Sequence, residues 1–267
     1  MNVRPITFVI AGLLIWEALS FQSASGSVIV YQEDFDSFSV GAIAGQNGWT
    51  ATLGTPQIAV GDTGGADRVV AGTSGSAQGN ARNLSLYSLS SNTTELTFEG
   101  RMRMRGGNGN RVNFQGAAGT DIIGFGAGFG GFNFVVVNDA DTKLFTGNAP
   151  GGNALSSSSH AWYDVIFTVL FNDSSDATGT FAVKKDGQAS FSTLVSGLDL
   201  QLPALYEDPT QWTGFLLELR TSSDQQDDFL LSATLIPEPS TCALSLIGLA
   251  GLGLLAWRRR RQLRIVD

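Results

Sequence analysis

Cysteine and histidine are nearly absent from this sequence of 267 residues, which holds one of each, Cys242 and His160. A single cysteine cannot form an intrachain disulfide, so the fold must be held by its core and its sheets. One histidine and one cysteine are too few for a histidine–cysteine zinc site, and they offer no ordinary Ser-His-Asp or Cys-His catalytic arrangement. We therefore expect a protein that is not an enzyme, with no catalytic residues and no required cofactor.

Charged residues are also scarce, at 15% of the sequence, and basic residues are fewer than acidic ones. Arg4 and five C-terminal arginines account for six of the 16 basic residues, which leaves 10 in residues 27–236. That stretch keeps 21 of the 24 acidic residues, all except Glu17, Glu238 and Asp267. A body this acidic repels nucleic acid and anionic lipid, so nucleic acid is not an expected partner.

Helical periodicity is missing from residues 28–235, where apolar residues instead alternate with polar ones, as in half-buried strands. Gly100 interrupts one such run and is expected to form a β-bulge. Lys185-Asp186-Gly187 predicts a hairpin with a type I′ turn. Residues 27–235 are therefore predicted to form one all-β antiparallel sandwich. The apolar positions of the main runs are Leu96, Phe98, Met102, Met104, Val112, Phe114, Phe132, Phe134, Val136, Tyr163, Val165, Phe167, Val169, Phe171, Phe215, Leu217, Leu219, Phe229, Leu231, Ala233 and Leu235.

The N-terminus has the three parts of a secretory signal peptide. Arg4 precedes an apolar run from Ile6 to Leu19, and small residues such as Ser20 and Ser25 follow it. We expect residues 1–26 to be a signal peptide that directs export. A buried N-terminal helix is the alternative.

The C-terminus carries a tail of three parts in residues 236–267. Pro237-Glu238-Pro239-Ser240 comes first, and residues 241–257, which carry no charge, follow it. As a helix, this run spans roughly 25 Å, enough to cross a thinned bilayer. Arg258-Arg259-Arg260-Arg261 then form a stop-transfer cluster that holds this end in the cytoplasm and the body outside it. An ordinary single-pass anchor is one interpretation.

This order of Pro-Glu-Pro, short apolar helix and arginine block resembles the PEP-CTERM sorting signal of Gram-negative bacteria. The resemblance implies that an exosortase recognises Pro237, Glu238 and Pro239 after the secretion machinery has exported the chain. It also implies an inner-membrane intermediate held by the C-terminal helix, followed by delivery to the cell surface or the extracellular matrix. Proteins with this signal tend to accompany exopolysaccharide production and biofilm formation.

Two segments of the body resemble concanavalin A-like and laminin-G-like jelly rolls. One runs from Glu33-Asp34-Phe35-Asp36 to Trp49, and the other leads from Trp162-Tyr163-Asp164-Val165 to an Asp-Gly turn. The resemblance implies a jelly-roll sandwich, and a fold of this kind does not by itself define a function.

Acidic residues near both ends of the body are candidate ligands for a structural calcium ion. The first and last strands of sandwiches often pair, which would bring such oxygen ligands together. Solvated turn residues are the alternative interpretation. The candidate ligands are Glu33, Asp34, Asp36, Asp227 and Asp228.

Four aromatic residues are candidates for a carbohydrate-binding face, although such residues more often belong to the core. These are Trp49, Trp162, Tyr206 and Trp212. Three functions stay open: a non-catalytic surface or matrix protein that binds exopolysaccharide, a polysaccharide-active enzyme of jelly-roll fold, and a purely structural envelope protein. The enzyme is disfavoured because no strand carries acids at alternating positions facing one cleft.

Overall fold

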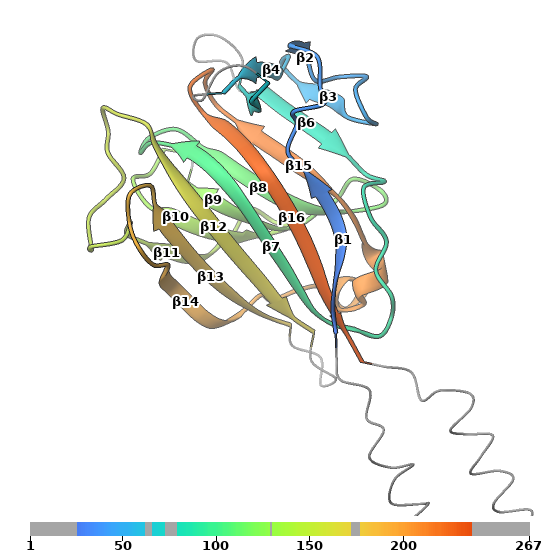
Figure 1. Cartoon of the computed structure of the whole chain (residues 1–267). Helices are drawn as coiled ribbons and strands as arrows, with labels where there is room; N and C mark the ends of the chain where they lie inside the picture. Colours follow the sequence, from blue (N-terminus) through green and yellow to red (C-terminus); the bar gives the residue numbers. More distant parts are fainter. Residues whose placement is uncertain (1–25, 62–65, 73–78, 129, 172–176, 237–267) are drawn as a thin grey trace, which may run out of the picture. The chain divides into compact units, whose positions relative to one another are not determined.

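The structure, a computed structural model, describes residues 26–61, 66–72, 79–128, 130–171 and 177–236. These residues form sixteen β-strands and two short 3-10 helices (Figure 1). The strands of the first half are β1 (Ser27–Glu33), β2 (Gly41–Ala42), β3 (Thr50–Leu53), β4 (Gln57–Val60), β5 (Arg68–Ala71), β6 (Gly79–Asn83), β7 (Thr93–Met104) and β8 (Asn110–Gly116). The second half contains β9 (Asp121–Ala127), β10 (Phe134–Asn138), β11 (Lys143–Gly147), β12 (Ala161–Leu170), β13 (Thr178–Lys185), β14 (Ser192–Asp199), η1 (Ala204–Glu207), η2 (Pro209–Gln211), β15 (Trp212–Leu219) and β16 (Gln225–Leu235).

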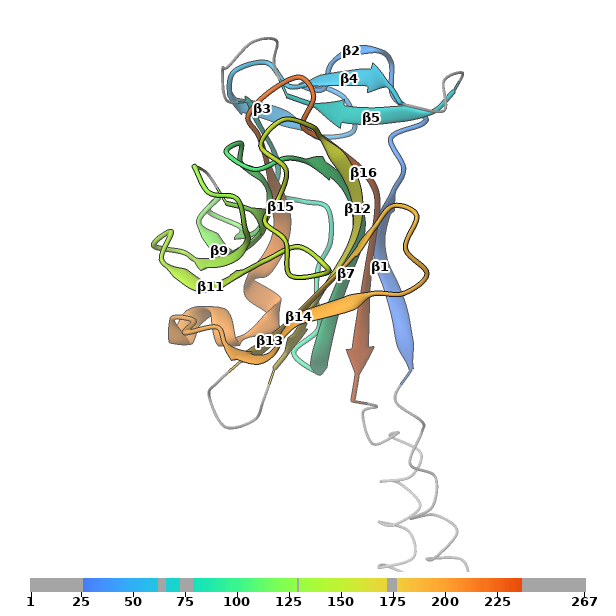
Figure 2. The ribbon, with the colours of Figure 1, turned by 90° about the vertical axis from the view of Figure 1, so that its left-hand side faces the viewer.

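The strands form two antiparallel sheets that pack face to face (Figure 2). The nine-stranded sheet has the order β14-β13-β12-β7-β16-β5-β4-β2, with β1 also paired to β16. The seven-stranded sheet has the order β11-β10-β9-β8-β15-β6-β3. Neighbours in space that are far apart in sequence include β7 and β16. The structure thus confirms the antiparallel sandwich that the alternating pattern predicted and the jelly-roll fold that the resemblance implied.

Phenylalanine rings fill the space between the sheets. Cross-strand neighbours on the nine-stranded sheet align Phe98, Phe167 and Phe181 in one row. Rings from the opposite sheet pack on them, with Phe125 stacked on Phe167 at 4.6 Å and tilted edge-on to Phe98 at 5.2 Å. Offset and edge-to-face pairs of this kind add about 0.5–1.5 kcal/mol each to the burial of apolar area. The predicted inward faces of the strands are therefore confirmed, except at Phe132, which precedes β10 and is 44% exposed.

Two local predictions were wrong in detail. The pairing of β7 with β12 passes Gly100 without a shift, and the bulge lies on β16, between Asp227 and Leu230. Gly187 has a positive φ of 83° but Asp186 does not, so the turn after β13 is not type I′. The loop after β13 is also longer than a two-residue hairpin turn, since β13 ends at Lys185 and β14 begins at Ser192.

Residues Ser27–Leu235 form one compact unit. Its first and last strands lie side by side, with Ser27 opposite Thr234 (Figure 1). None of the helices in the described part of the chain is long and apolar enough to cross a membrane. The expected signal peptide (1–26, apart from Gly26), membrane span (241–257) and arginine cluster (258–261) lie outside the described residues.

Candidate functional site

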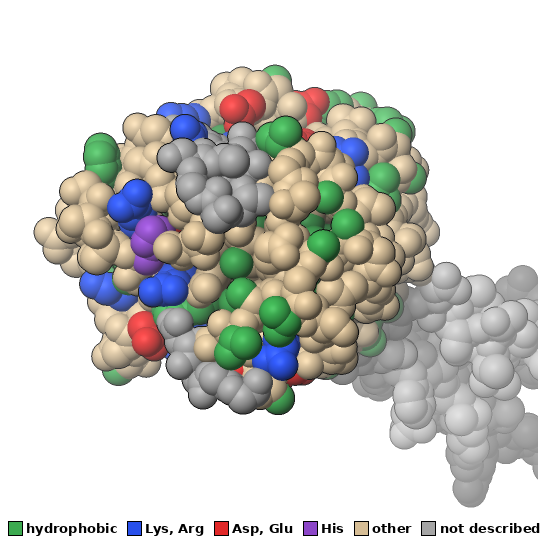
Figure 3. Space-filling view, turned by 90° about the horizontal axis from the view of Figure 1, so that it is seen from above, with side chains coloured by type: hydrophobic (Ala, Val, Ile, Leu, Met, Phe, Trp, Pro, Cys, Tyr) green, Lys and Arg blue, Asp and Glu red, His purple; other side chains and the backbone are tan. Residues whose placement is uncertain are grey.

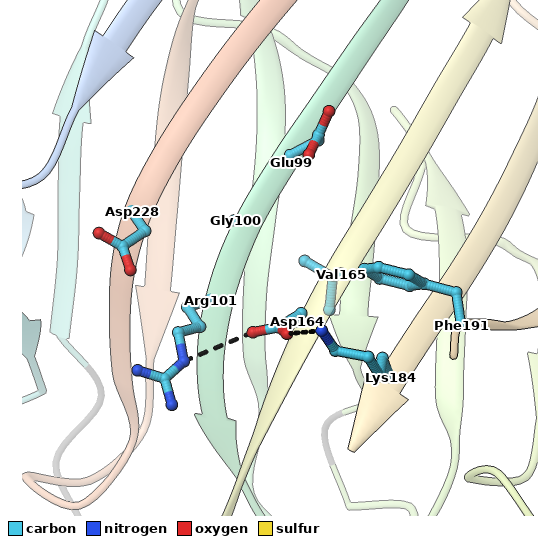
Figure 4. Close-up of a pocket in the computed structure, with 8 residues that line it drawn as sticks. All are labelled: Glu99, Gly100, Arg101, Asp164, Val165, Lys184, Phe191 and Asp228. Carbon is cyan, nitrogen blue, oxygen red and sulfur yellow. Dashed lines mark ion pairs between the residues drawn. The ribbon is translucent and has the colours of Figure 1, made fainter. Parts of the chain in front are cut away.

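A groove lies on the outer face of the nine-stranded sheet, across β16, β7, β12 and β13 (Figure 4). The cross-strand pair Gly100–Val165 forms its floor. Its volume of about 260 Å³ is close to the lower end of small-molecule pockets, about 300 Å³. The groove can therefore hold a small ligand or one unit of a polymer. The lining residues are Glu99, Gly100, Arg101, Asp164, Val165, Lys184, Phe191 and Asp228.

Strand alternation places opposite charges on neighbouring strands of the groove. Asp164 of β12 stands across from Arg101 of β7 on one side and Lys184 of β13 on the other. Its two carboxylate oxygens lie 3.4 Å from Arg101 Nε and 2.7 Å from Lys184 Nζ. Pairs this exposed contribute little stability, about 0–1 kcal/mol. They place the three polar groups next to one another along the groove, where a ligand can meet them.

The bulge on β16 brings a further carboxylate to the groove. Asp228 and Phe229 together stand opposite the single residue Gly100. Asp228 adopts the left-handed conformation with φ 53°, which non-glycine residues seldom take. Its side chain is exposed and reaches the groove, while Phe229 is buried in the core (Figure 4). Bulges commonly re-aim a side chain in this way beside a functional site.

Two aromatic rings accompany the groove cations. The guanidinium carbon of Arg101 lies 4.9 Å from the ring centre of Trp162, and Lys184 Nζ lies 5.1 Å from the ring centre of Phe191. Trp162 is only 9% exposed, whereas Phe191 is 39% exposed. Phe191 therefore offers the larger apolar surface to a ligand, and Trp162 supports Arg101.

The other predicted carbohydrate-binding aromatics do not form a platform. Trp49 and Trp212 have no exposed surface, because each ring packs in the core, against Phe35 at 6.1 Å and Phe114 at 5.2 Å respectively. Trp212 Nε1 donates to the main-chain oxygen of Tyr206, which is half-buried in η1. The prediction was therefore wrong for Trp49 and Trp212, and Trp162 is the candidate that lies beside the groove.

The pairing of β1 with β16 brings together four of the five predicted calcium ligands. Asp34 and Asp36 follow β1, and Asp227 and Asp228 belong to β16. Burial, together with the charges of Asp228, Asp67 and Asp36, raises the pKa of Asp227 to about 8. Burial and the charges of Asp34, Asp67 and Asp36 also raise the pKa of Asp228, and Arg101 opposes this. Asp227 Oδ1 is buried and has no hydrogen-bond partner among the described residues.

Glu33, the fifth predicted ligand, has different partners. Its carboxylate accepts hydrogen bonds from the main-chain N–H of Phe35 at 3.3 Å and from Asn47 Nδ2 at 3.0 Å. Burial raises the pKa of Glu33, and these bonds oppose the rise. Within the part of the chain that the structure describes, no three acidic, histidine or cysteine side chains stand close enough to hold a metal ion. A calcium ion would need these side chains to close in, or main-chain oxygens to complete its shell.

Sequence reasoning missed the groove residues Arg101, Asp164 and Lys184 and the acidic neighbour Asp67. The alternation of polar positions on β7, β12 and β13 was visible, but only the register of the strands shows which polar residues face one another. Asp67 comes from the connection between β4 and β5, far in sequence from the other acids.

Comparison with protein families identifies the end of the chain. Residues 235–261 match the PEP-CTERM protein-sorting motif, which confirms the predicted sorting tail. The chain is therefore an exported cell-surface protein that is processed by an exosortase, with a jelly-roll sandwich as its body. No curated protein matches the chain.

Solved structures share the fold of the body at low sequence identity. The globular domain of Trypanosoma cruzi calreticulin aligns with a TM-score of 0.51 and 10% identity, covering 76% of this chain and 88% of that one. A protein of unknown function from Shewanella oneidensis aligns at 0.45 and 15% identity, covering 88% and 96%. A Bauhinia forficata lectin in complex with GalNAc aligns at 0.42 and 10% identity, covering 79% and 98%. At these identities the likeness concerns the fold alone.

Proposed function

We propose that this chain is a non-catalytic protein of the cell surface or extracellular matrix that binds extracellular polysaccharide in the groove on the nine-stranded sheet. The observation that carries the proposal is the lining of the groove. It combines charged groups that pair with one another at Asp164 with the exposed ring of Phe191. Sugar hydroxyls both donate and accept hydrogen bonds, so they can pair with cations and carboxylates together. The apolar face of a sugar ring can lie on an aromatic ring.

The direction of the strands supports this placement. The sorting motif begins at residue 235, where β16 ends. Asp228 lies seven residues earlier in the same strand, which at about 3.3 Å per residue is roughly 23 Å. The groove is thus separated from the end of the domain at which the tail continues.

A structural calcium ion at the acidic cluster is part of the proposal. Asp227 supports it, because a buried carboxylate oxygen without a partner, among other acids, is unfavourable unless it is protonated or paired with a cation. Asp34, Asp36, Asp67, Asp227 and Asp228 are the residues that would contribute oxygen ligands. Calcium takes six to eight oxygen ligands, including main-chain carbonyls. Its role there would be to fix the bulge that presents Asp228 to the groove.

A binding assay with neutral polymers tests the proposed function. Full-length protein solubilised from membranes is applied to immobilised galactan, glucan and mannan, with and without calcium. Phe191→Ala should reduce binding to the preferred polymer about tenfold, a loss typical of one sugar–aromatic contact. Leu205→Ala is the matched control, because Leu205 is 59% exposed on η1 and lies outside the groove. Absence of binding to every polymer would leave the purely structural alternative.

A polysaccharide-active enzyme is the second candidate, and one observation favours it. Asp228 has a raised pKa, as a general acid requires, and it shares the groove with Glu99 (Figure 4). Hydrolysis of a glycosidic bond needs two such carboxyl groups. New reducing ends or unsaturated products released from any polymer, and lost in both Glu99→Gln and Asp228→Asn, would establish catalysis and overturn the non-catalytic proposal.

A further inference from the structure

The sole histidine lies at the end of the sandwich where β7 ends, β12 begins and β15 turns into β16. His160 Nε2 lies 3.2 Å from Asp224 Oδ1. Asp224 has no exposed surface, and its second oxygen accepts from the N–H and hydroxyl of Thr221 at 2.7 and 3.0 Å. The negative charge of Asp224 is therefore satisfied inside the protein, while His160 reaches the surface. Figure 3 shows the histidine on this face among Lys and Arg side chains.

Two arginines, Arg103 of β7 and Arg105 just beyond its end, adjoin His160. Burial lowers the pKa of His160, Asp224 opposes this, and the charges of Arg105 and Arg103 lower it further. Arg103 stands across from Trp162 in β12, and its guanidinium lies 3.3 Å from Gln225 Oε1. Arg105 Nε has no hydrogen-bond partner among the described residues. The cationic charge here comes from the two arginines, and His160 adds a neutral hydrogen-bonding group near pH 7.

This concentration of positive charge is unusual for the body of this chain. Residues 27–236 hold 10 basic and 21 acidic residues. Three of those ten are Arg101 and Arg103, at alternate positions of β7, and Arg105, just beyond its end. Arg101 belongs to the groove, where it is paired with Asp164. Arg103 and Arg105 lie further along the chain at the end of the sheet, where the acid Asp224 is buried.

An aromatic ring and hydroxyl groups border the arginines. Phe132 is 44% exposed, and its ring lies where a Cβ on Gly106 would stand, so it covers the residue that follows Arg105. Gly106 N–H donates to the main-chain oxygen of Ser156 at 2.8 Å, and Ser156 Oγ lies 3.0 Å from Ser159 Oγ. The segment before His160 therefore presents hydroxyls beside the cations and an exposed ring.

We propose that Arg103, Arg105 and His160 form a binding site for the carboxylate groups of an acidic polysaccharide, with Phe132 as an apolar contact for the sugar ring. The inference rests on the proposed function and names the class of polymer, a uronate-containing one. Guanidinium groups bind carboxylates through paired, charge-assisted hydrogen bonds. Because the rest of the body repels anions, such a polymer is drawn to this end of the sheet and away from the acidic cluster.

The test compares polymers that differ in their acidic groups. Full-length protein solubilised from membranes is applied to polygalacturonate, to the same polymer after reduction of its carboxyl groups, and to dextran sulfate. Polygalacturonate is expected to bind at least about tenfold more tightly than the reduced polymer, and the preference should decrease as salt is raised. Tight binding of dextran sulfate with no binding of polygalacturonate would overturn the assignment to carboxylates.

Variants locate the site. Arg105→Gln should lose about tenfold in affinity for polygalacturonate and leave the reduced polymer unaffected. Arg105→Lys keeps the charge but loses the paired geometry, so its affinity for polygalacturonate should lie between those of the unchanged protein and Arg105→Gln. Lys143→Gln, on β11, is the control that removes one charge elsewhere, and unfolding curves of all variants check that they remain folded. Equal losses in Lys143→Gln and Arg105→Gln would overturn the site. Retained binding of neutral polymer with no preference for acid would refute this inference alone, whereas no binding to any polymer would also refute the proposed function.

Discussion

Asp227 and Asp228 are consecutive residues with opposite surroundings: Asp227 is 7% exposed within the acidic cluster, and Asp228 is exposed at the groove. The bulge of β16 separates them, because it turns the chain through a left-handed conformation at Asp228. One irregularity therefore serves both the proposed calcium site and the proposed sugar site. We therefore expect stability and binding to be coupled at this point of the strand.

The stability of the metal-free protein should depend on pH through Asp227. Its pKa rises from an ordinary value of 3.8 to about 8 on folding, so between these values the folded chain keeps a proton that the unfolded chain has lost. Stability should thus fall as pH rises from about 4 to about 8, by at most about 1.4 kcal/mol per unit. Urea unfolding at pH 5 and pH 8 measures it. Asp227→Asn should flatten this slope, whereas Asp139→Asn, on an exposed loop, should keep it.

Calcium should reverse that loss of stability. Above pH 8 Asp227 is ionised, and a bound cation offsets its repulsion with Asp228, Asp36 and Asp67. At a calcium concentration 100 times the dissociation constant, the gain is about 2.7 kcal/mol. Unfolding curves at pH 8 in calcium and in EDTA measure the gain, with magnesium as the control ion. A gain of the same size in Asp227→Asn would show that calcium binds elsewhere.

Gly100 is needed for the packing of the core. A Cβ at this position would lie 2.8 Å from the ring of Phe98 and 3.2 Å from that of Phe229. Gly100→Ala should therefore cost about 1–3 kcal/mol of unfolding free energy through overpacking. Gly131→Ala is the matched control, since the nearest atom to its Cβ would be 4.0 Å away. Equal stabilities of the two variants would contradict the crowding seen around Gly100.

Much of the fold could be predicted because the side-chain period of two fixes which face of a strand is buried. Phe98 and Phe167 lie in the core as their alternation indicated. The position of the bulge could not be read in the same way. A glycine in a strand indicates that some neighbour approaches closely. At Gly100 these neighbours are the core rings of Phe98 and Phe229. The extra residue of the bulge lies on the partner strand, β16.

The candidate site was less accessible to sequence reasoning. A tryptophan in a strand can face inward or outward. Trp212 lies in the core and Trp162 beside the groove, and only their neighbours in the sheets show this difference. The acidic cluster was predicted because it depends on the pairing of the first and last strands, a common feature of sandwiches. The groove and the proposed carboxylate site at Arg103 and Arg105 were missed, because each needs the register of several strands to bring its charges together.

The buried ion pair of Arg111 with Glu218 should contribute far more to the free energy of unfolding than the exposed pair of Arg111 with Asp141. Arg111 and Glu218 are 8% and 7% exposed, and Arg111 Nε donates to Glu218 Oε2 at 2.7 Å. Glu218→Ala leaves a buried cation and should cost about 3–5 kcal/mol. Asp141 also pairs with Arg111, but its side chain is 74% exposed, so Asp141→Ala should cost less than about 1 kcal/mol. Urea unfolding of both variants measures these costs. Similar losses of unfolding free energy in the two variants would contradict the prediction from their difference in burial.

Processing of the tail should depend on the triplet that opens the sorting motif. Pro237→Ala combined with Glu238→Ala should leave the full-length chain in the inner membrane, because the exosortase would no longer recognise it. Arg264→Gln is the control, since residue 264 lies beyond the matched motif of 235–261. Cell fractionation, with mass spectrometry of the mature C-terminus, measures the outcome. Normal processing of the double variant would show that the enzyme reads another part of the tail, and the apolar run at 241–257 would then be the next segment to alter.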